Sequence, residues 1–163
     1  MKNVPRRYIP NKLTLKDKKK QRRMIKKSRK MYKKGKYYTR KPVKSYKSKT
    51  SSHILKARRI YKIHDIKPSK ELAVKTGCSL NTLKKIVNKG QGAYYSSGSR
   101  PNQSGKSWGY ARLASSITSG KAAAVDYKLL EQGCKNNSKA LKLAKKSKKK
   151  YGHSRRKTPS VKL

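Results

Sequence analysis

Side chains able to support catalysis are few in this sequence, and their spacing does not assemble an active site. The histidines His53, His64 and His153 stand among basic residues, and only His64 has a carboxylate beside it, that of Asp65. Adjacency in sequence does not orient a base towards a nucleophile. The chain holds five acidic residues in all, and no spacing of His, Cys or carboxylates is that of a metal site. We therefore predict that the protein is not an enzyme and uses no metal or cofactor.

Two glycine-containing segments resemble nucleotide-binding loops, but both depart from the motifs. The segment GQG at 90–92 is too short for a dinucleotide fingerprint and follows no predicted strand. The segment GKS at 105–107 matches the end of a P-loop, yet Arg100 stands where the first glycine of that motif belongs. ATP binding through these segments is not predicted.

The loop expected between residues 91 and 106 has residue types that are common at interfaces. Tyr and Arg bury surface area while keeping polar reach, so they often anchor contacts between proteins. Tyr94, Tyr95 and Arg100 are therefore candidates for binding a partner. Packing of these aromatic side chains inside the protein, for example on Trp108, is the alternative, and the sequence leaves both open.

The two cysteines, Cys78 and Cys134, are far apart in the chain and form no CxxC pair. Such pairs mark zinc sites and thiol–disulfide centres. We interpret both residues as buried thiols of a protein kept in a reducing compartment, where disulfides are rare.

The most informative local pattern is ELAVKTGCSLNTLKKIVNKG at 71–90. Ala73 precedes Gly77 by four residues, and a helix-turn-helix needs a small residue and a left-handed glycine at such positions. Leu83 and Ile86 fall where the second helix would pack back on the first. The pattern predicts a helix-turn-helix-like hairpin.

The second helix of that hairpin would present a polar face. Asn, Thr and Lys side chains on such a face can reach phosphates or base edges in a DNA major groove. The candidate contact residues are Asn81, Thr82, Lys84, Lys85, Asn88 and Lys89. A plain helical hairpin with solvated lysines is the alternative interpretation.

The net charge calls for a polyanionic partner. The chain of 163 residues has 49 Lys and Arg against five acids, a formal charge of +44. The chain has 12 Leu, 8 Ile, 6 Val and no Phe. Together these residues make up less than the share of about 20% below which highly charged chains tend towards disorder. Because like charges also repel one another, we expect the complete fold only in a complex with nucleic acid, an anionic membrane surface or acidic protein surfaces.

Membrane insertion and secretion are not predicted. No apolar run approaches the roughly 20 residues of a spanning helix. The basic start MKNVPRRYIP has no apolar segment of the kind found in signal peptides.

The charge is concentrated towards the two ends of the chain. Residues 1–60 carry 25 basic side chains and one acid, whereas residues 71–140 carry 11 basic and three acidic side chains. We expect a basic N-terminal arm over 1–51, a central helical domain over 52–144 and a basic C-terminal tail over 145–163. The further residues expected to contact a polyanion or partner are Arg22, Arg23, Lys26, Lys27, Arg112, Lys148, Lys149, Arg155 and Arg156.

The N-terminal arm contains one predicted helix. Thr14 and Asp17 have the spacing of a capping box, and Gly35 is a suitable residue to end a helix, so a helix is predicted over 15–34. The stretch that follows, as far as Ser52, is rich in Ser, Thr and Lys and predicts an extended linker.

The centre is predicted to be helical with short loops. Helices are expected from Ser52 to Lys62, from Ser69 to Gly77, from Ser79 to Gly90, from Trp108 to Gly120, and onward from Asp126 and from Ser138. Alternating strand patterns are essentially absent. The fold class is therefore all-α: a small helical domain containing the helix-turn-helix-like hairpin, flanked by long basic arms that are extended or helical.

A series of short motifs occurs between residues 60 and 135. They are Lys89-Gly90-x-Gly92-Ala93-Tyr94, Ser99-Arg100-Pro101, Ser107-Trp108, Ala111-Arg112, Gly120-Lys121 and Val125-Asp126. This region resembles an uncharacterised domain of large double-stranded DNA viruses of algae and protists (phycodnavirus-like), with shorter relatives in tailed phages. That family also tends to have a Lys-rich arm similar to residues 28–49. It has no assigned activity, so the resemblance implies a setting, the viral particle, and no catalytic residues.

Three functions agree with these features. The leading expectation is a virion structural protein of minor capsid or internal cement type, located inside the capsid and intracellular in the host during assembly. Its arms would bind other capsid proteins, packaged DNA or both, and would become ordered on assembly. The second is a genome-condensing or regulatory DNA-binding protein that uses the helix-turn-helix-like unit. The third, a ribosomal-type RNA-binding protein, fits the composition but not the resemblance.

Overall fold

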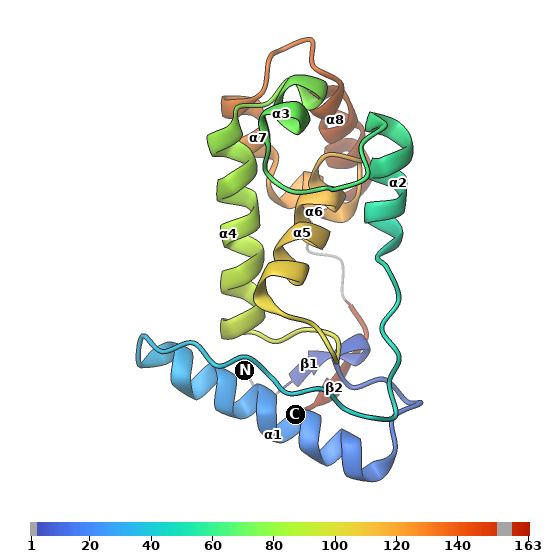
Figure 1. The fold of residues 1–163 in the computed structure, drawn as a ribbon, viewed down its shortest axis with the longest axis vertical. Coiled ribbons are helices and arrows are strands. Elements are labelled where there is room, and N and C mark those ends of the chain that lie inside the picture. The colour runs from blue at the N-terminus through green and yellow to red at the C-terminus, as the bar shows by residue number, and fades with distance from the viewer. Residues whose placement is uncertain (1–2, 153–157) are drawn as a thin grey trace. The chain divides into compact units, whose positions relative to one another are not determined.

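The computed structural model describes residues 3–152 and 158–163, and this part of the chain is mostly helical (Figure 1). The α-helices are α1 (Leu15–Lys33), α2 (Ser52–Tyr61), α3 (Lys70–Thr76), α4 (Leu80–Ser96), α5 (Gly105–Ser116), α6 (Lys121–Val125), α7 (Tyr127–Gly133) and α8 (Lys139–Tyr151). The predicted all-α class is confirmed at this level.

Two short strands accompany the helices. The strands β1 (Asn3–Pro5) and β2 (Ser160–Lys162) pair antiparallel with Val4 opposite Val161, and a 3-10 helix, Arg6–Tyr8, follows β1. Nothing in the sequence predicts this pair, because strands of three residues are too short to display an alternating pattern.

The chain divides into two compact units, which we call the first and the second unit. The first comprises the described residues of 1–49, 91–108 and 157–163, and the second those of 50–90 and 109–156. The predicted arm at 1–51 is therefore largely part of a folded unit that also includes mid-chain residues. The predicted tail from residue 145 starts inside α8, so the boundary expected at residue 144 falls within a helix.

Helix α1 has nearly the predicted bounds. The Thr14 hydroxyl accepts a hydrogen bond from the Asp17 backbone N–H at 3.3 Å, and Gly35 has a φ of +68° just beyond the helix end. The carboxylate of Asp17 accepts from both the backbone N–H (2.8 Å) and the hydroxyl (2.6 Å) of Ser45. These bonds hold the pKa of the Asp17 carboxyl below its usual value. The carboxylate thus joins α1 to the segment that follows it.

The segment 36–49 is extended, as predicted, but it does not behave as a separate linker. It runs back along α1 (Figure 1), and Val43 is buried with Leu13 and Met24. Asn102 holds it in place: its side chain accepts from the Val43 N–H at 2.8 Å and donates to the carbonyl of Tyr46 at 2.6 Å. The prediction of a separate linker is wrong here. The apolar side chains of this segment pack on residues far away in the sequence, and its backbone groups are hydrogen-bonded by such residues.

Arg40 lies at the centre of the first unit. It is 6% exposed, and its guanidinium donates to the Ser28 hydroxyl (2.9 Å), the Tyr94 carbonyl (2.9 Å) and the Ser99 hydroxyl (2.8 Å). Its Cζ atom also lies 3.7 Å from the Tyr94 ring centroid. Burial lowers the pKa of the Arg40 guanidinium, while the neighbouring tyrosines oppose that shift. One of the many cations of this chain is therefore a core residue.

The second unit is built around a separate apolar core. Helix α8 packs on α6 and α7, and the Tyr61 hydroxyl donates to the Ile117 carbonyl. Burial raises the pKa of Tyr61. The fully buried large side chains of this core include Leu72, Leu83, Ile86, Leu113, Ile117, Leu130 and Leu141.

Hydroxyl caps start several helices of the second unit. Ser69 and Ser138 accept from the backbone N–H groups of Leu72 and Leu141, as the sequence predicts. Helix α2 begins one residue after Ser51, which is its N-cap in place of the expected Ser52. Helix α6 is an addition, since a run of alanines after Gly120 offers no distinct start signal.

Helix α4 does not end at Gly90, contrary to prediction, but continues to Ser96. A Cβ atom at Gly90 would lie 2.6 Å from the Cα atom of Gly109 in α5. The glycine therefore allows the backbones of α4 and α5 to approach each other. In the sequence alone, a glycine with this role cannot be distinguished from a glycine that ends a helix.

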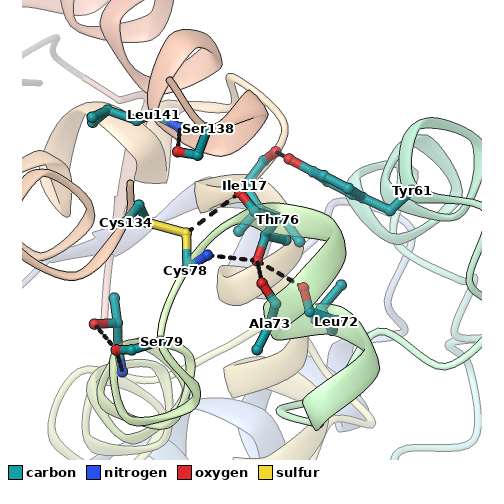
Figure 2. Close-up of a disulfide and its surroundings, with 11 residues drawn as sticks. Tyr61, Leu72, Ala73, Thr76, Cys78, Ser79, Ile117, Cys134, Ser138 and Leu141 are labelled. Carbon is teal, nitrogen blue, oxygen red and sulfur yellow. Dashed lines mark hydrogen bonds between the residues drawn. A yellow bond between two sulfur atoms is a disulfide. The ribbon is translucent and has the colours of Figure 1, made fainter. Parts of the chain in front are cut away.

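Cys78 and Cys134 form a disulfide (Figure 2). This corrects the interpretation of both residues as free thiols. Two backbone hydrogen bonds flank the disulfide, from Ser79 N–H to the Gly133 carbonyl and from Lys135 N–H to the Gly77 carbonyl, each 2.8 Å long. They join the turn before α4 to the end of α7. The pairing could not be predicted because the 56-residue separation says nothing about which residues become neighbours.

Candidate polyanion interface

Helices α3 and α4 are joined by a short turn that contains a left-handed glycine. Gly77 has φ +73° and ψ 19°, and its N–H donates to the Ala73 carbonyl at 3.0 Å. The Ser79 hydroxyl accepts from the Thr82 N–H at 3.2 Å and so caps α4. A Cβ atom at Gly77 would lie 2.5 Å from the Ser138 Cβ atom. The turn is thus packed against the start of α8 and is not a free-standing hairpin.

The exposed face of α4 contains four of the predicted contact residues. Asn81, Lys84, Lys85 and Asn88 are all exposed. The prediction is wrong for Thr82, which is 6% exposed. Its hydroxyl is hydrogen-bonded to the Ser79 hydroxyl at 2.8 Å, and Gly133 packs against it so closely that a Cβ atom there would overlap the threonine. Thr82 therefore belongs to the packing of α4 on α7.

Lys89 and Arg112, two further candidates, are bound to a buried carboxylate. The Lys89 Nζ atom lies 2.6 Å from Asp126 Oδ1, and Arg112 donates to both carboxylate oxygens at 2.8 and 2.9 Å. The Ser116 hydroxyl donates a fourth bond at 3.0 Å. Helix α7 begins directly after Asp126, as expected, but the Asp126 side chain makes no cap bond there. Both cations thus neutralise the buried carboxylate of Asp126.

The protonation of Asp126 follows from two opposing effects. Burial raises the pKa of its carboxyl, whereas the hydrogen bonds and charges of Arg112 and Lys89 lower it and outweigh the burial. The net direction is down, so Asp126 is ionised at neutral pH.

The candidates expected in the loop have mixed positions within the first unit: Tyr94 and Tyr95 lie on α4, and only Arg100 lies between α4 and α5. Arg100 is exposed, Tyr95 is half-buried and Tyr94 is fully buried. The two tyrosine rings meet edge to face with centroids 4.9 Å apart. Tyr94 therefore follows the alternative of packing inside the protein and does not serve as an interface anchor. Trp108 packs on Tyr8, with centroids 5.8 Å apart.

Helix α1 presents a row of cations that extends over its whole length. Its members are Lys16, Lys19, Arg23, Lys26, Lys30 and Lys33, spaced alternately three and four residues apart, and all six are exposed. Residues at such spacing lie on one face of a helix. The opposite face is buried through Gln21, Met24 and Ile25. We call this row the α1 stripe.

The remaining predicted α1 cations lie beside the stripe. Lys27 is exposed, with its Nζ atom 4.7 Å from the Tyr38 ring centroid. Arg22 is half-buried and donates to the Lys162 carbonyl at 3.3 Å. The sequence-based prediction did not include the other stripe members, which are Lys16, Lys19, Lys30 and Lys33. The alternating three- and four-residue spacing of basic residues, visible in the sequence, could have identified them.

The predicted tail cations belong partly to α8. Lys148 and Lys149 are exposed there, and the Lys148 Nζ atom lies 4.1 Å from the Tyr127 ring centroid. Arg155 and Arg156 lie outside the described residues. Four other cations of the second unit, not among the candidates, line a cavity of about 420 Å³: Lys56, Arg59, Lys146 and Lys150.

The described residues, 3–152 and 158–163, contain neither a cluster of metal-ligating side chains nor a helix able to span a membrane. No three His, Cys, Asp or Glu side chains in this part lie close enough to hold a metal ion. None of its helices combines the length and apolar character needed to cross a bilayer.

The family to which the chain is similar has no known activity. A model of a protein family described as a family of unknown function (DUF5824) matches residues 5–132, which is most of the chain. No curated protein and no solved structure matches the chain.

Proposed function

We propose that this chain, which belongs to the family of unknown function DUF5824, is a non-enzymatic structural protein of a double-stranded DNA virion. It would be of minor capsid or internal cement type and would bind packaged DNA without sequence preference through its exposed cations. The viral setting rests on the resemblance of residues 60–135 to a viral domain. The binding role rests on one observation, the α1 stripe.

The stripe has dimensions and chemistry suited to a duplex. From Lys16 to Lys33 it extends about 26 Å at the rise of an α-helix. An α-helix fits the major groove, which is about 12 Å wide, and lysines and arginines at its surface displace the counterions that surround DNA. All six side chains of the stripe are cations, so the whole row attracts the same partner.

The protein's own acids can neutralise only a small part of its positive charge. Asp126 is used by Lys89 and Arg112, and Asp17 is used by Ser45. Asp65, on the surface, pairs with His64 and Lys67. With 49 basic residues against five acids, neutralisation has to come from another molecule. This supports a role in an assembly rich in phosphate.

The binding role is tested by duplex affinity measured against salt concentration. For wild-type protein and random duplex, we expect a steep linear fall of log affinity with log salt. Replacing Lys19, Lys26 and Lys30 by Gln should reduce that slope by about 0.9 for each phosphate that is no longer neutralised. The matched control replaces Lys128, Lys135 and Lys142, three exposed lysines of the second unit, by Gln. Equal changes in both variants, or no salt dependence, would contradict binding through the stripe.

The virion role is tested by the composition of purified particles. A copy number fixed to the capsid symmetry, and retained after the DNA is removed, supports a structural component. Loss of the protein together with the DNA would restrict the role to genome binding. Absence from particles would reject the virion role while leaving the duplex measurement meaningful.

A second candidate, a sequence-specific DNA-binding protein, is favoured by the α3–α4 hairpin. Two features support this candidate: the left-handed Gly77 before α4, and the exposed polar side chains of Asn81, Lys84, Lys85 and Asn88 on that helix. Replacing Lys84 and Lys85 by Glu should then weaken duplex binding more than the same change at Lys148 and Lys149. A preference for one sequence among random duplexes would support this candidate over the first.

A further inference from the structure

The cavity of about 420 Å³ in the second unit has the size of a small-molecule site and is not part of the α1 stripe. Ligand pockets in proteins usually have volumes of about 300–1,000 Å³. Helix α2, helix α8 and the turn at Ser119 and Gly120 form its walls. The P-loop-like segment 105–107, which belongs to the first unit, contributes no residue to it.

Four basic side chains line this cavity, two on each helix. Lys56 and Arg59 lie one helical turn apart on α2, and Lys146 and Lys150 lie one turn apart on α8. Among the described residues that line the cavity, none is Asp or Glu. Like charges gathered around one hollow repel one another. Their repulsion is relieved when an anion occupies the space between them.

The floor of the cavity is fixed in place. The buried Ser147 hydroxyl donates to the Gly120 carbonyl at 2.7 Å, which ties the turn to α8. A Cβ atom at Gly120 would clash with Ser115 and would lie 3.1 Å from His53 Cε1, so the turn packs tightly against α2. Lys56 Nζ lies 3.4 Å from the Ser119 hydroxyl. A ligand would therefore meet walls that are already arranged.

Neutral hydrogen-bonding groups supplement the charges. Ser52, Ser119 and Tyr151 also line the cavity, and the hydroxyl of such a residue can donate to an oxygen of an anion. Ser52 is the first residue of α2, where the helix dipole favours negative charge. Cations on two helices, together with residues that carry hydroxyls, suit phosphate oxygens.

We propose that this cavity binds a small polyphosphate, that is, a molecule with two or more linked phosphate groups. A phosphate monoester carries a charge of about −1.5 to −2 at neutral pH, so more than one phosphate is needed to balance four cations. Both inorganic polyphosphate and nucleoside di- or triphosphates have this chemistry. The inference goes beyond the proposed DNA-binding role and does not depend on it, because the cavity and the α1 stripe share no residue.

The test is calorimetric titration of the full chain with sodium tripolyphosphate and, separately, with ATP at about 0.15 M salt, where weak surface pairing is screened. We expect one saturable site. Replacing Lys146 and Lys150 by Gln should weaken binding about ten-fold for each cation removed, because ten-fold corresponds to about 1.4 kcal/mol, close to the lower end for a charged hydrogen bond. Tighter binding of ATP would identify a nucleotide ligand, and equal or tighter binding of tripolyphosphate the inorganic chain.

The control variant replaces Lys142 and Lys145, exposed residues of the same helix that do not line the cavity, by Gln. It has the same net charge as the cavity variant and should bind like the wild type. A second cavity variant, with Lys56 and Arg59 replaced by Gln, should lose affinity as well, which guards against a folding defect confined to α8. Equal weakening in cavity and control variants, absence of a saturable site, or displacement of tripolyphosphate by random duplex DNA would overturn the inference.

Discussion

Asp126 and Arg112 are joined by two parallel hydrogen bonds inside the second unit, Nε to Oδ2 at 2.9 Å and Nη2 to Oδ1 at 2.8 Å. The Asp126 side chain is fully buried and that of Arg112 is 21% exposed. Lys89 completes the charge balance from α4. This arrangement links α4, α5 and the junction between α6 and α7 through one acid. Two cations of a strongly cationic chain are thereby committed to its own fold.

Replacing Asp126 by Asn should strongly destabilise the protein at neutral pH. The substitution keeps the size of the side chain but leaves Arg112 and Lys89 without a counter-charge, and breaking a buried pair in this way costs about 3–5 kcal/mol. The free energy of unfolding in urea measures the effect. Glu71→Gln, at an exposed acid of α3, is the control and should cost less than about 1 kcal/mol. Similar costs for both would mean that Asp126 does not organise the second unit.

Acid should remove the contribution of Asp126. Its folded-state pKa is lowered relative to the unfolded value of about 3.9. A group with a lowered folded-state pKa contributes stability that is present above its unfolded pKa and is lost as the pH falls through the folded pKa. The stability difference between wild type and Asp126→Asn should thus be constant near neutrality and shrink below about pH 4. Urea midpoints measured from neutral to strongly acidic pH test this, and a difference independent of pH would refute it.

Reduction of the Cys78–Cys134 disulfide should lower stability. The cross-link closes a loop with a sequence separation of 56, for which the chain-entropy relation gives about 4 kcal/mol. Thermal unfolding with and without a reducing agent measures the loss. A variant with both cysteines replaced by Ser should unfold at the same temperature in both conditions. Insensitivity of the wild type to reductant would show that the two sulfurs are not joined in solution.

Gly90 and Gly92 should respond oppositely to alanine, although both lie in α4. At Gly90 the new methyl would lie 2.6 Å from backbone atom Cα of Gly109, which cannot move as a side chain can. Overpacking of this kind costs about 1–3 kcal/mol. At Gly92 the nearest atom, the Tyr32 hydroxyl, is 3.8 Å away, so Gly92→Ala should gain up to about 1 kcal/mol of helix propensity. Melting temperatures of the two variants test the pair, and a stabilising Gly90→Ala would contradict the close helix approach.

Local signals in the sequence were sufficient for the helices whose ends are set by their own residues. The Thr14 cap and the glycine after α1 predict that helix almost to the residue, and Ser69, Gly77 and Ser138 do the same in the second unit. Capping depends on atoms within one helical turn, so no distant residue is needed to specify it. The exposed α4 residues Lys84 and Lys85 could be placed for the same reason.

Features that depend on distant neighbours could not be placed in this way. Gly90 has the same residue type as a helix stop, and only the backbone of Gly109 shows that it serves a crossing of two helices. Tyr94 is of a residue type that often anchors interfaces. In the structure, however, Arg40, 54 residues earlier in the chain, is stacked on its ring in the core. Two of the cavity cations lie on α2 and two on α8. Each pair can be seen in the sequence, but the sequence does not show that the two helices bring the pairs together.

The sequence alone determined the helical class, the cap positions and the excess of positive charge, because each follows from composition or from residues a few positions apart. The tertiary structure decided which cations remain available to a partner. It buried Arg40, bound Lys89 and Arg112 to Asp126, aligned the α1 stripe on an exposed face and gathered four cations around one cavity. The physical reason is that a charge is free or committed according to its neighbours in space, and those neighbours are brought together only by folding.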